Sequence, residues 1–547
     1  MSAFIKKRAD MTRRNRRKDI APVFKEYNQD QLIMFPPSID ELIPENHLVR
    51  VVDSILRLMN ISPLLRKYKG GGTSSYHPEM MLKVIVYAYT CHIYSSRQIA
   101  KALRENIAFM WLSGGNKPDF RTINNFRSGI LGDAIEEVFA VMTLILLEKG
   151  YINLANLFID GTKLEADANR HGVVWSKNTK RYKEISKEHI REILRQIKEI
   201  NDKENREYGE CDLEELGGRE EINSTDIERV VQTINERLKD KESKDKTDKT
   251  IERLGRKIEK EYLPKIKKYE KQEEIAGGRK SYSTTDKDAS VVMMKDGRLL
   301  PGYNVQIGTE NQFIANYSIH TNAGDSGLFK AHLEKLKELT GLLPGAVIGD
   351  SAYGSEENYS YCEENGIDAY LKYNSFHKEK ENKFKTDISK KENMTYHAIK
   401  DEYECAGGRI LKFKEEREKH TDNGFKYSIR RYECISCDGC ILSSLCKKTK
   451  GNRTIDVNKK LNYHRWKARR LLDSEKGIIL RKKRSIDVES VFGDIKRNMK
   501  FNRFSLRGIH KVNCEFGLIS MAHNIKKIFK IQLEAIQNHF FIYVLAT

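Results

Sequence analysis

The sequence predicts an α/β protein whose core is a mixed sheet, with an all-α domain before it and two insertions within it. Three observations lead to this prediction. Short apolar runs bounded by turn residues, which are typical of strands, lie at 154–160 and between 300 and 373. Apolar residues at helical spacing occupy 40–150 and recur in a highly charged stretch at 178–277. A chain of 547 residues also exceeds the size of a single core, so two to four domains are expected.

The N-terminal part is predicted to be a flexible basic arm at 1–20 followed by a helical domain at 21–150. Pro78 suits the first turn of a helix in "HPEMMLKVIVYAYTC", and a serine cap starts the next helix in "SSRQIAKALREN". A further helix is expected near "DFRTINNFR". Short helices with basic faces permit a helix-turn-helix that binds DNA, although an ordinary helical bundle fits equally well. The basic residues concerned are Arg97, Lys101, Arg104, Arg121 and Arg127.

The mixed sheet is expected in two parts, at 151–177 and 278–400, separated by the charged insertion at 178–277. Its first strand is "LANLFID". After the insertion come a hairpin of "GYNVQIG" and "FIANYSIH", a helix in "GLFKAHLEKLKEL", the strand "GAVIGD", a helix in "SEENYSYCEEN" and the strand "DAYLKY". The insertion is predicted to be a charged helical hairpin or a short coiled coil. Apart from it, the element order is that of the ribonuclease H-like fold. A small Cys-rich insertion at 401–460 and C-terminal helices of the core at 461–547 complete the chain.

Two aspartates end apolar strands of this sheet, Asp160 after "LANLFI" and Asp350 after "GAVIG". Neighbouring strands would bring both side chains to one edge, where open α/β sheets bind ligands. Glu489 lies beside a predicted buried helical stripe, where it can be buried against the sheet, and Lys496 follows two turns later on the same face. Three carboxylates at an open site suit Mg²⁺, and two such ions can catalyse phosphoryl transfer. Each carboxylate alone could instead serve as a turn residue, a helix cap or an ion-pair partner. The stripe consists of Val488, Val491, Phe492 and Ile495.

Cysteines crowd into "YECISCDGCILSSLCKK", which contains Cys434, Cys437, Cys440 and Cys446. Thiolates at this spacing can converge tetrahedrally on one ion, and a loop with few apolar residues needs such a metal cross-link to be stable. Structural Zn²⁺ is favoured, while an iron–sulfur cluster and unliganded thiols are the alternatives. Cys405, in "YECAGG", could replace one member of the set.

Three blocks of the sequence resemble the DDE transposases of bacterial insertion sequences: "FIDGTKLEADANR", "GDSAYGSEENY" and "VESVFGDIKRNMKFNRFSLRG". The stretch "HPEMMLKVIVYAYTCHIYSSRQIAKAL" resembles the N-terminal helical domain of that family. The resemblance implies that Asp160, Asp350 and Glu489 bind the catalytic metal ions, and Lys496 matches the family's lysine after the glutamate. The family's tyrosine and arginine before the glutamate are replaced here by Lys482 and Ser485, and Arg484, one residue away, could substitute for the arginine.

The resemblance implies an enzyme that cuts DNA at the ends of an insertion sequence with Mg²⁺ and transfers the strands to target DNA. The net charge of +20 favours a polyanionic partner, in agreement with this function. Synapsis of two ends implies a homodimer or a larger assembly. No secretory signal or membrane span is found, so a bacterial cytoplasmic, nucleoid-associated location is expected. A nuclease without strand transfer and a non-catalytic DNA-binding protein are the alternatives. The expected contacts to the DNA backbone are Arg484, Lys496, Arg497, Lys500 and Arg503.

Overall fold

The computed structural model describes residues 38–546 except 69–70, 72–73, 209–221, 240–245 and 422, so the predicted basic arm at 1–20 lies outside it. The chain divides into two compact units. The first unit comprises residues up to 164, 304–320 and everything from 324 on, and the second unit comprises 165–303 with 321–323. The protein has a mixed α/β structure, as the sequence predicts.

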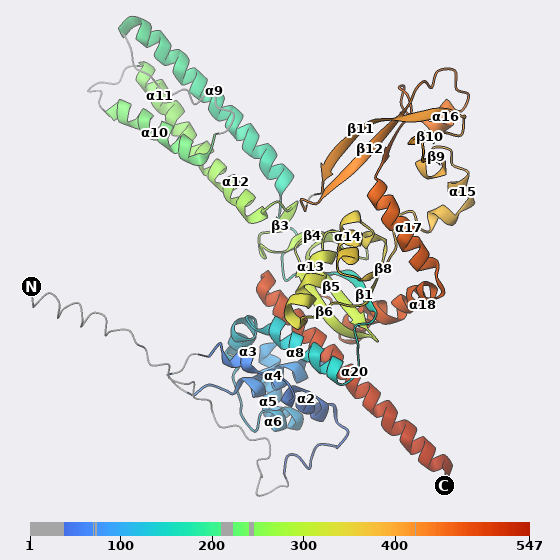
Figure 1. Ribbon diagram of the computed structural model, residues 1–547. Coiled ribbons are helices and arrows are strands. Elements are labelled where there is room, and N and C mark those ends of the chain that lie inside the picture. Colours follow the sequence, from blue (N-terminus) through green and yellow to red (C-terminus); the bar gives the residue numbers. More distant parts are fainter. Residues whose placement is uncertain are drawn as a thin grey trace, which may run out of the picture. The chain divides into compact units, whose positions relative to one another are not determined.

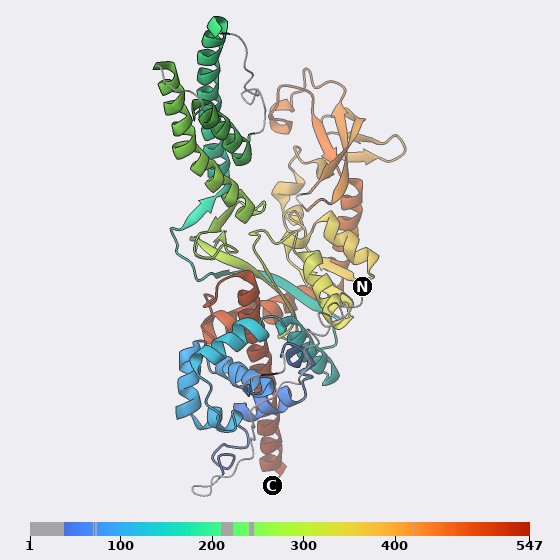
Figure 2. The ribbon, with the colours of Figure 1, turned by 90° about the vertical axis from the view of Figure 1, so that its left-hand side faces the viewer.

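The N-terminal part of the first unit is helical, and its central helix α4 packs against the long C-terminal helix α20 (Figures 1 and 2). Pro78 is the first residue of α4, and the Asp119 carboxylate caps α7 by accepting a hydrogen bond from the Thr122 amide at 2.7 Å. Arg127, predicted to lie on a basic face, is instead buried and donates to the Tyr94 carbonyl at 2.7 Å. The elements are α2 (Leu48–Arg57), α3 (Ser62–Leu65), α4 (Pro78–Thr90), α5 (Ser96–Glu105), α6 (Ile107–Leu112), α7 (Phe120–Asn125), η1 (Phe126–Ile130), α8 (Ile135–Glu148) and α20 (Ile509–Ala546).

The main sheet has the strand order β4-β5-β1-β7-β8, and β6 pairs with β5. Strands β1, β7 and β8 are parallel, whereas β5 is antiparallel to both β4 and β6. Almost every residue of β5 and β6 is buried, because the helices α8, α13 and α20 pack on this part of the sheet. The strands are β1 (Leu157–Glu165), β4 (Ser290–Met293), β5 (Leu299–Glu310), β6 (Phe313–His320), β7 (Ala346–Gly349) and β8 (Asp368–Leu371).

The helices around this sheet follow the predicted order. Helix α13 (Phe329–Thr340) packs on β6, and α14 (Glu356–Glu364), which follows the short turn η4 (Ser351–Tyr353), packs on β8. Helices α17 (Lys459–Asp473) and α18 (Glu475–Arg484) lie against β8 and β7 respectively. The predicted hairpin, both later strands and both intervening helices are therefore confirmed in type and order.

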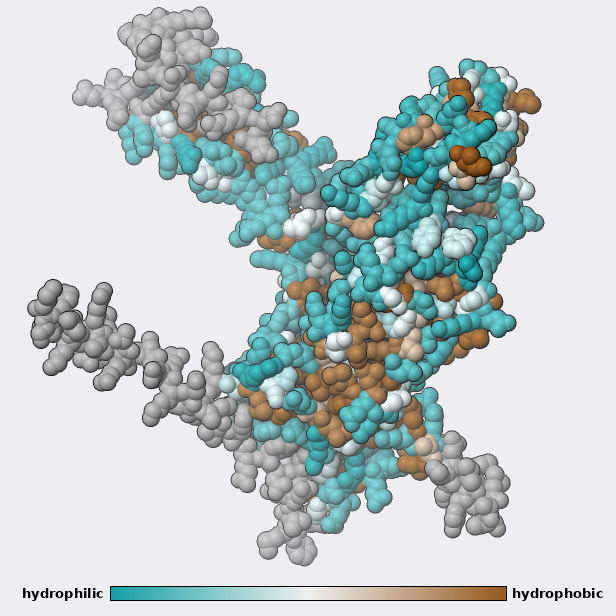
Figure 3. Space-filling model, viewed as in Figure 1, coloured by the Kyte–Doolittle hydropathy of each residue, from teal (hydrophilic) through white to brown (hydrophobic). Residues whose placement is uncertain are grey.

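A second sheet, which the sequence did not predict, occupies the region expected to be a small Cys-rich insertion. It has the antiparallel order β13-β12-β11-β10-β9, and most of it is the long β11–β12 hairpin, whose visible surface is largely hydrophilic (Figures 1 and 3). A few buried side chains, including Tyr403, Leu411 and Tyr432, form its small core. The elements are η5 (Lys378–Lys380), α15 (Asn382–Lys385), η6 (Lys391–Asn393), β9 (Thr395–His397), β10 (Glu402–Glu404), β11 (Ile410–His420), β12 (Lys426–Cys434), α16 (Ser443–Cys446) and β13 (Thr454–Val457).

The second unit is more elaborate than the predicted helical hairpin. Its helices share one core of isoleucine, leucine and valine side chains, among them Ile190, Ile234 and Ile266. Helix α9 packs along α12, and α10 packs along α11, so that four helical stretches replace the expected two. The elements are β2 (Val173–Trp175), α9 (Ser176–Tyr208), α10 (Ser224–Lys239), α11 (Lys246–Lys257), η3 (Ile258–Tyr262), α12 (Leu263–Ala276) and β3 (Ser281–Ser283).

No helix formed by the described residues is both long enough and apolar enough to span a membrane.

Candidate active site

The parallel strands β1 and β7 bring two aspartates to one edge of the main sheet. Phe158 pairs with Ile348, so Asp160, two residues later on β1, lies beside Asp350, which directly follows β7. The Asp350 carboxylate also accepts a hydrogen bond from the Ala352 amide at 2.8 Å and so caps the turn η4. Strand β1 continues past Asp160 to Glu165, so the expectation that Asp160 ends its strand is wrong. The parallel register nevertheless brings together the two aspartates that the sequence singled out.

Arg484 connects Asp160 to Glu489. Its Nη2 lies 2.9 Å from Asp160 Oδ1, and its Nη1 lies 3.1 Å from Glu489 Oε1. The Arg484 side chain is only 11% exposed, whereas that of Glu489 is 53% exposed. The expectation that Glu489 is buried against the sheet is therefore wrong. Instead its carboxylate reaches the sheet edge through the guanidinium and remains open to solvent.

A π-helical turn explains why residues five positions apart can form this pair. In a regular α-helix, side chains meet at spacings of three or four residues. The segment η7 (Ser485–Glu489) is a π-helix, in which the wider turn brings residues five apart onto one face. A short α-helical turn, α19 (Ser490–Gly493), and a second π-helix, η8 (Asp494–Asn498), follow it. Such π-turns are frequent at functional sites.

The predicted apolar stripe fixes this helical segment to the rest of the unit. All four of its members, Val488, Val491, Phe492 and Ile495, are buried, as the sequence predicts. Glu489 follows the first of them, so burial of the stripe sets the direction in which its carboxylate points.

The turn between β5 and β6 also holds the segment that carries Glu489. Asn311 and Gln312 both have positive φ, which is characteristic of a two-residue hairpin turn that matches the twist of its strands. The buried Asp487 carboxylate accepts a hydrogen bond from the Gln312 amide at 2.9 Å, and the Gln312 side chain donates to the Ile486 carbonyl at 3.1 Å. His523 lies 2.8 Å from Asp494 and 2.9 Å from the Gln312 carbonyl. Sequence analysis did not identify these anchors.

Burial and charge shift the pKa values at this edge. Burial raises the pKa of Asp160 to about 6; Arg484 opposes the rise, and the Asp350 and Glu489 charges add to it. Burial also raises the pKa of Tyr353 well above its usual range, and the neighbouring carboxylates, Asp160 first among them, act in the same direction. Because these interactions are mutual, the three predicted carboxylates form one electrostatic cluster.

A polar network next to Asp160 is centred on Asp325. Its Oδ1 accepts hydrogen bonds from Lys163 Nζ at 2.7 Å, Asn304 Nδ2 at 2.7 Å and Gln306 Nε2 at 2.9 Å. The Tyr353 hydroxyl donates to Gln306. A side chain at Gly161 would collide with the Gln306 amide, which accounts for the glycine after Asp160. The sequence does contain a signal for this network, because the polar Asn304 and Gln306 occupy alternate positions of the buried strand β5.

The predicted DNA-contacting residues have different surroundings. Lys496 Nζ donates to Thr162 Oγ1 at 2.6 Å and to the Lys163 carbonyl at 3.2 Å, so it is fixed to β1 close to Asp160. Arg497, Lys500 and Arg503 are exposed. Arg484 differs from the expectation most, because its guanidinium faces the carboxylates at the sheet edge.

The cysteines of the second sheet have different surroundings. Cys434 is buried in the core of the second sheet, and its thiol donates to the Ser436 carbonyl at 3.3 Å. Cys405 and Cys440 both lie close to Gly407. A Cβ atom placed on that glycine would be 3.8 Å from the Cys405 Sγ and 3.5 Å from the Cys440 Sγ. Burial raises the pKa of Cys446, and among its thiol neighbours Cys405, Cys437 and Cys440 act in the same direction.

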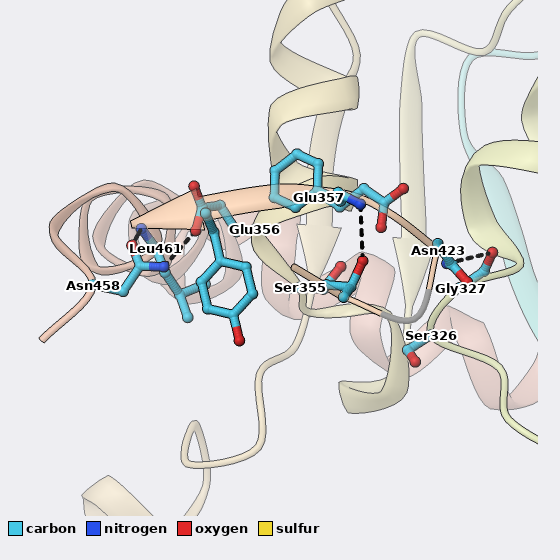
Figure 4. Close-up of a pocket in the computed structure, with 11 residues that line it drawn as sticks. Ser326, Gly327, Ser355, Glu356, Glu357, Asn423, Asn458 and Leu461 are labelled. Atoms are coloured by element: carbon cyan, nitrogen blue, oxygen red, sulfur yellow. Dashed lines mark hydrogen bonds between the residues drawn. The ribbon is translucent and has the colours of Figure 1, made fainter. Parts of the chain in front are cut away.

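A cavity of about 390 Å³ lies beside the loop that carries Asp325 (Figure 4). Asn423, at the tip of the β11–β12 hairpin, donates to the Gly327 carbonyl at 3.4 Å. Gly327 lies two residues after Asp325, so the hairpin tip contacts the loop that carries Asp325. The lining residues include Ser326, Gly327, Ser355, Glu356, Phe425 and Asn458.

No three His, Cys, Asp or Glu side chains in the described part of the chain are already arranged to hold a metal ion. At the sheet edge, the Arg484 guanidinium bridges two of the three carboxylates. The donor set itself consists of carboxylate oxygens, which suits a hard divalent cation.

Two segments of the chain match known protein families. Residues 404–529, which include Glu489, match a family described as a transposase DDE domain, and residues 37–129 match one described as a transposase domain (DUF772). No curated protein and no solved structure matches the chain.

Proposed function

We propose that this chain, which its two matched domains identify as a DDE transposase of an insertion-sequence family, cuts DNA at the ends of its element and joins the released ends to target DNA. The observation that carries the proposal is the convergence of Asp160, Asp350 and Glu489 at one sheet edge. Asp160 and Asp350 come from neighbouring parallel strands, and Arg484 contacts both Asp160 and Glu489. In a DDE enzyme these are the residues expected to hold the catalytic metal.

The three carboxylates would hold Mg²⁺, with two ions at the complete site. The chemistry that bound Mg²⁺ supplies is activation of the attacking water or 3′-hydroxyl and stabilisation of the leaving oxygen. The fit is supported by the charge at this edge, because the Asp350 and Glu489 charges add to the rise in the pKa of Asp160 that burial causes, and Asp160 and Glu489 already attract a guanidinium. A cation of higher charge density would satisfy the same oxygens better than Arg484 does.

The remaining residues would bind and orient the DNA. Lys496, fixed to β1, would neutralise a phosphate close to Asp160, and the exposed Arg497, Lys500 and Arg503 would hold the backbone further along. Arg484 would be released from the carboxylates when metal binds and would then be free to face a phosphate. Pairing of two element ends would require at least a dimer.

We assign the core to the ribonuclease H-like fold. The assignment is supported by the strand order β4-β5-β1-β7-β8 with β6 paired to β5, and by the combination of the antiparallel β5–β6 pair with the parallel β1–β7 pair. It is also supported by the two aspartates, since Asp160 on β1 lies beside Asp350, which directly follows the neighbouring parallel strand β7.

The cysteine cluster would hold one structural Zn²⁺, and the geometry favours Cys405, Cys437, Cys440 and Cys446 over the set predicted from the sequence. Cys434 packs in the core and its thiol donates to the Ser436 carbonyl, and its thiol neighbours are Cys437 and Cys405, whereas Cys446 has Cys405, Cys437 and Cys440. A zinc ion would connect the β10–β11 turn to the segment after β12, and so stabilise a region with a small apolar core.

The central test is cleavage of labelled DNA carrying the element's flanking ends in Mg²⁺. The native chain should cut at the ends and join them to target DNA, while Asp160→Asn and Glu489→Gln should bind without cutting. Glu364→Gln, an exposed acid at the end of α14, is the matched control and should cut normally. Cutting without joining would favour a nuclease, and binding without cutting by the native chain would favour a DNA-binding protein.

A further inference from the structure

The functional edge of the main sheet continues from the two aspartates to Lys372. Gly349 of β7 pairs with Leu371 of β8 in parallel register. The next residues on the two strands are Asp350 and Lys372, so the lysine leaves the sheet beside the second aspartate. The edge thus carries Asp160, Asp350 and Lys372 on three consecutive strands.

The ammonium group of Lys372 has no structural partner that would explain its position. The side chain is partly buried, and it forms no hydrogen bond or ion pair with any residue that the structure describes. The charges of Arg484 and Arg481 act unfavourably on this ammonium, and the charges of Asp350 and Glu489 act favourably. A partly desolvated cation next to two other cations is unfavourable unless an anion completes the group.

The two arginines point to the same conclusion independently. The Nε atoms of Arg481 and Arg484 are buried, and neither has a hydrogen-bond partner among the described residues. The Arg481 guanidinium stacks over Phe376 and lies 3.9 Å from Asp473, which leaves donors unused. Buried donors without acceptors are rare in folded proteins and indicate a missing acceptor.

We propose that Lys372 binds a non-bridging oxygen of a DNA phosphate at or next to the bond that is cut. Lys372 lies beside Asp350, so its ammonium group is at the same sheet edge as the carboxylates. The exposed Arg497, Lys500 and Arg503 do not lie on these strands. A phosphate is the anion that a DNA-cleaving enzyme brings to this edge, so the inference rests on the proposed function. The competing explanation is that Lys372 only balances the charge of Asp350.

The test measures binding of the full-length protein to an end-containing duplex over a range of KCl concentrations, without divalent metal. Lys372→Met, which keeps the aliphatic stem, should lower the slope of log K against log salt by about 0.9. Lys372→Arg should retain the slope. The control is Lys337→Met, because Lys337 Nζ lies 3.5 Å from Asn365, which precedes β8 at the opposite edge of the sheet.

A second arm locates the contact. The duplex is prepared with single neutral methylphosphonate linkages at successive positions around the cut site. Lys372→Met should weaken binding to every duplex except one, because a neutral linkage at the contacted phosphate removes the same interaction. At saturating protein, Mg²⁺-dependent cleavage by Lys372→Met should fall about tenfold to a hundredfold.

The outcomes separate this inference from the proposed function. If the native chain neither binds nor cuts the ends, the proposed function fails. If the native chain cuts but Lys372→Met keeps the salt slope and loses the same affinity on every methylphosphonate duplex, Lys372 does not bind phosphate. If Lys372→Met is poorly folded, Lys372→Gln, which removes the charge but keeps a polar side chain, decides on the methylphosphonate series, since its loss of affinity must disappear at one linkage if Lys372 binds that phosphate.

Discussion

Replacing Asp160 by Asn should stabilise the metal-free protein, increasingly so as the pH rises. The pKa of Asp160 is raised from 3.8 to about 6, chiefly by burial, and its side chain is only 21% exposed. A tenfold change in an ionisation constant corresponds to about 1.4 kcal/mol, so the ionised carboxylate costs about 3 kcal/mol of folding free energy. Because the folded state has the higher pKa, the native chain loses this stability as the pH rises from 3.8 through 6.

The amide introduced by Asp160→Asn would remain neutral throughout this range, so the advantage of the variant should grow by about 1.4 kcal/mol between pH 5 and pH 8. An unfolding entropy of about 2.1 cal/mol/K per residue, for a unit of about 400 residues, converts this difference to about 1.7 °C in melting temperature. Scanning calorimetry in EDTA at the two pH values measures it.

Asp494→Asn is the matched control with the opposite sign. Burial raises the pKa of Asp494, but hydrogen bonds from His523 and Asn498 outweigh it and leave that pKa lowered. The ionised form of Asp494 therefore stabilises the fold, and its replacement should lower the melting temperature at both pH values. An Asp160→Asn variant whose advantage stays constant or shrinks from pH 5 to pH 8 would refute the electrostatic account of the site.

Two further predictions concern the cysteine cluster and the anchor of the segment that carries Glu489. Purified protein should contain about one zinc per chain; Cys405→Ser should lose the metal and Cys434→Ser should retain it, and the reverse result would restore the set predicted from the sequence. Asp487→Ala removes the acceptor of the Gln312 amide and should destabilise the protein by about 1–3 kcal/mol and slow DNA cleavage, whereas Asp368→Ala at the exposed opposite edge should do neither. Normal cleavage by Asp487→Ala would show that the β5–β6 turn does not position Glu489.

The sequence predicted the parts of the fold in which periodic burial dominates. Strands β5 to β8 and helices α13 and α14 follow apolar patterns that only one secondary structure satisfies. The β11–β12 hairpin was missed because its residues are mostly charged and exposed, so little burial marks the strands. Its register depends on cross-strand pairs such as Arg430 with Glu416, which sequence spacing does not reveal.

The same reasoning explains which parts of the site could be predicted. Asp160 and Asp350 were identifiable because each directly follows a run of apolar residues typical of a strand, although β1 continues past Asp160 to Glu165. Asp325 was not, because it lies in a loop and acquires its role only by accepting hydrogen bonds from residues distant in sequence. The choice between Cys405 and Cys434 likewise depends on which thiol the second sheet buries.

Arg484 links these observations, because its position follows from the π-turn and its partners follow from the sheet. The turn places Arg484 and Glu489 on one face, and the parallel register places Asp160 beside Asp350. Carboxylates brought together by two independent elements repel one another, so a cation is required at their meeting point. Arg484 meets that requirement with 2.9 Å and 3.1 Å ion pairs, yet its Nε has no acceptor among the residues that the structure describes. Metal and DNA phosphate together would satisfy the carboxylates and the unused donors at once, which is why the same edge supports both the proposed function and the role of Lys372.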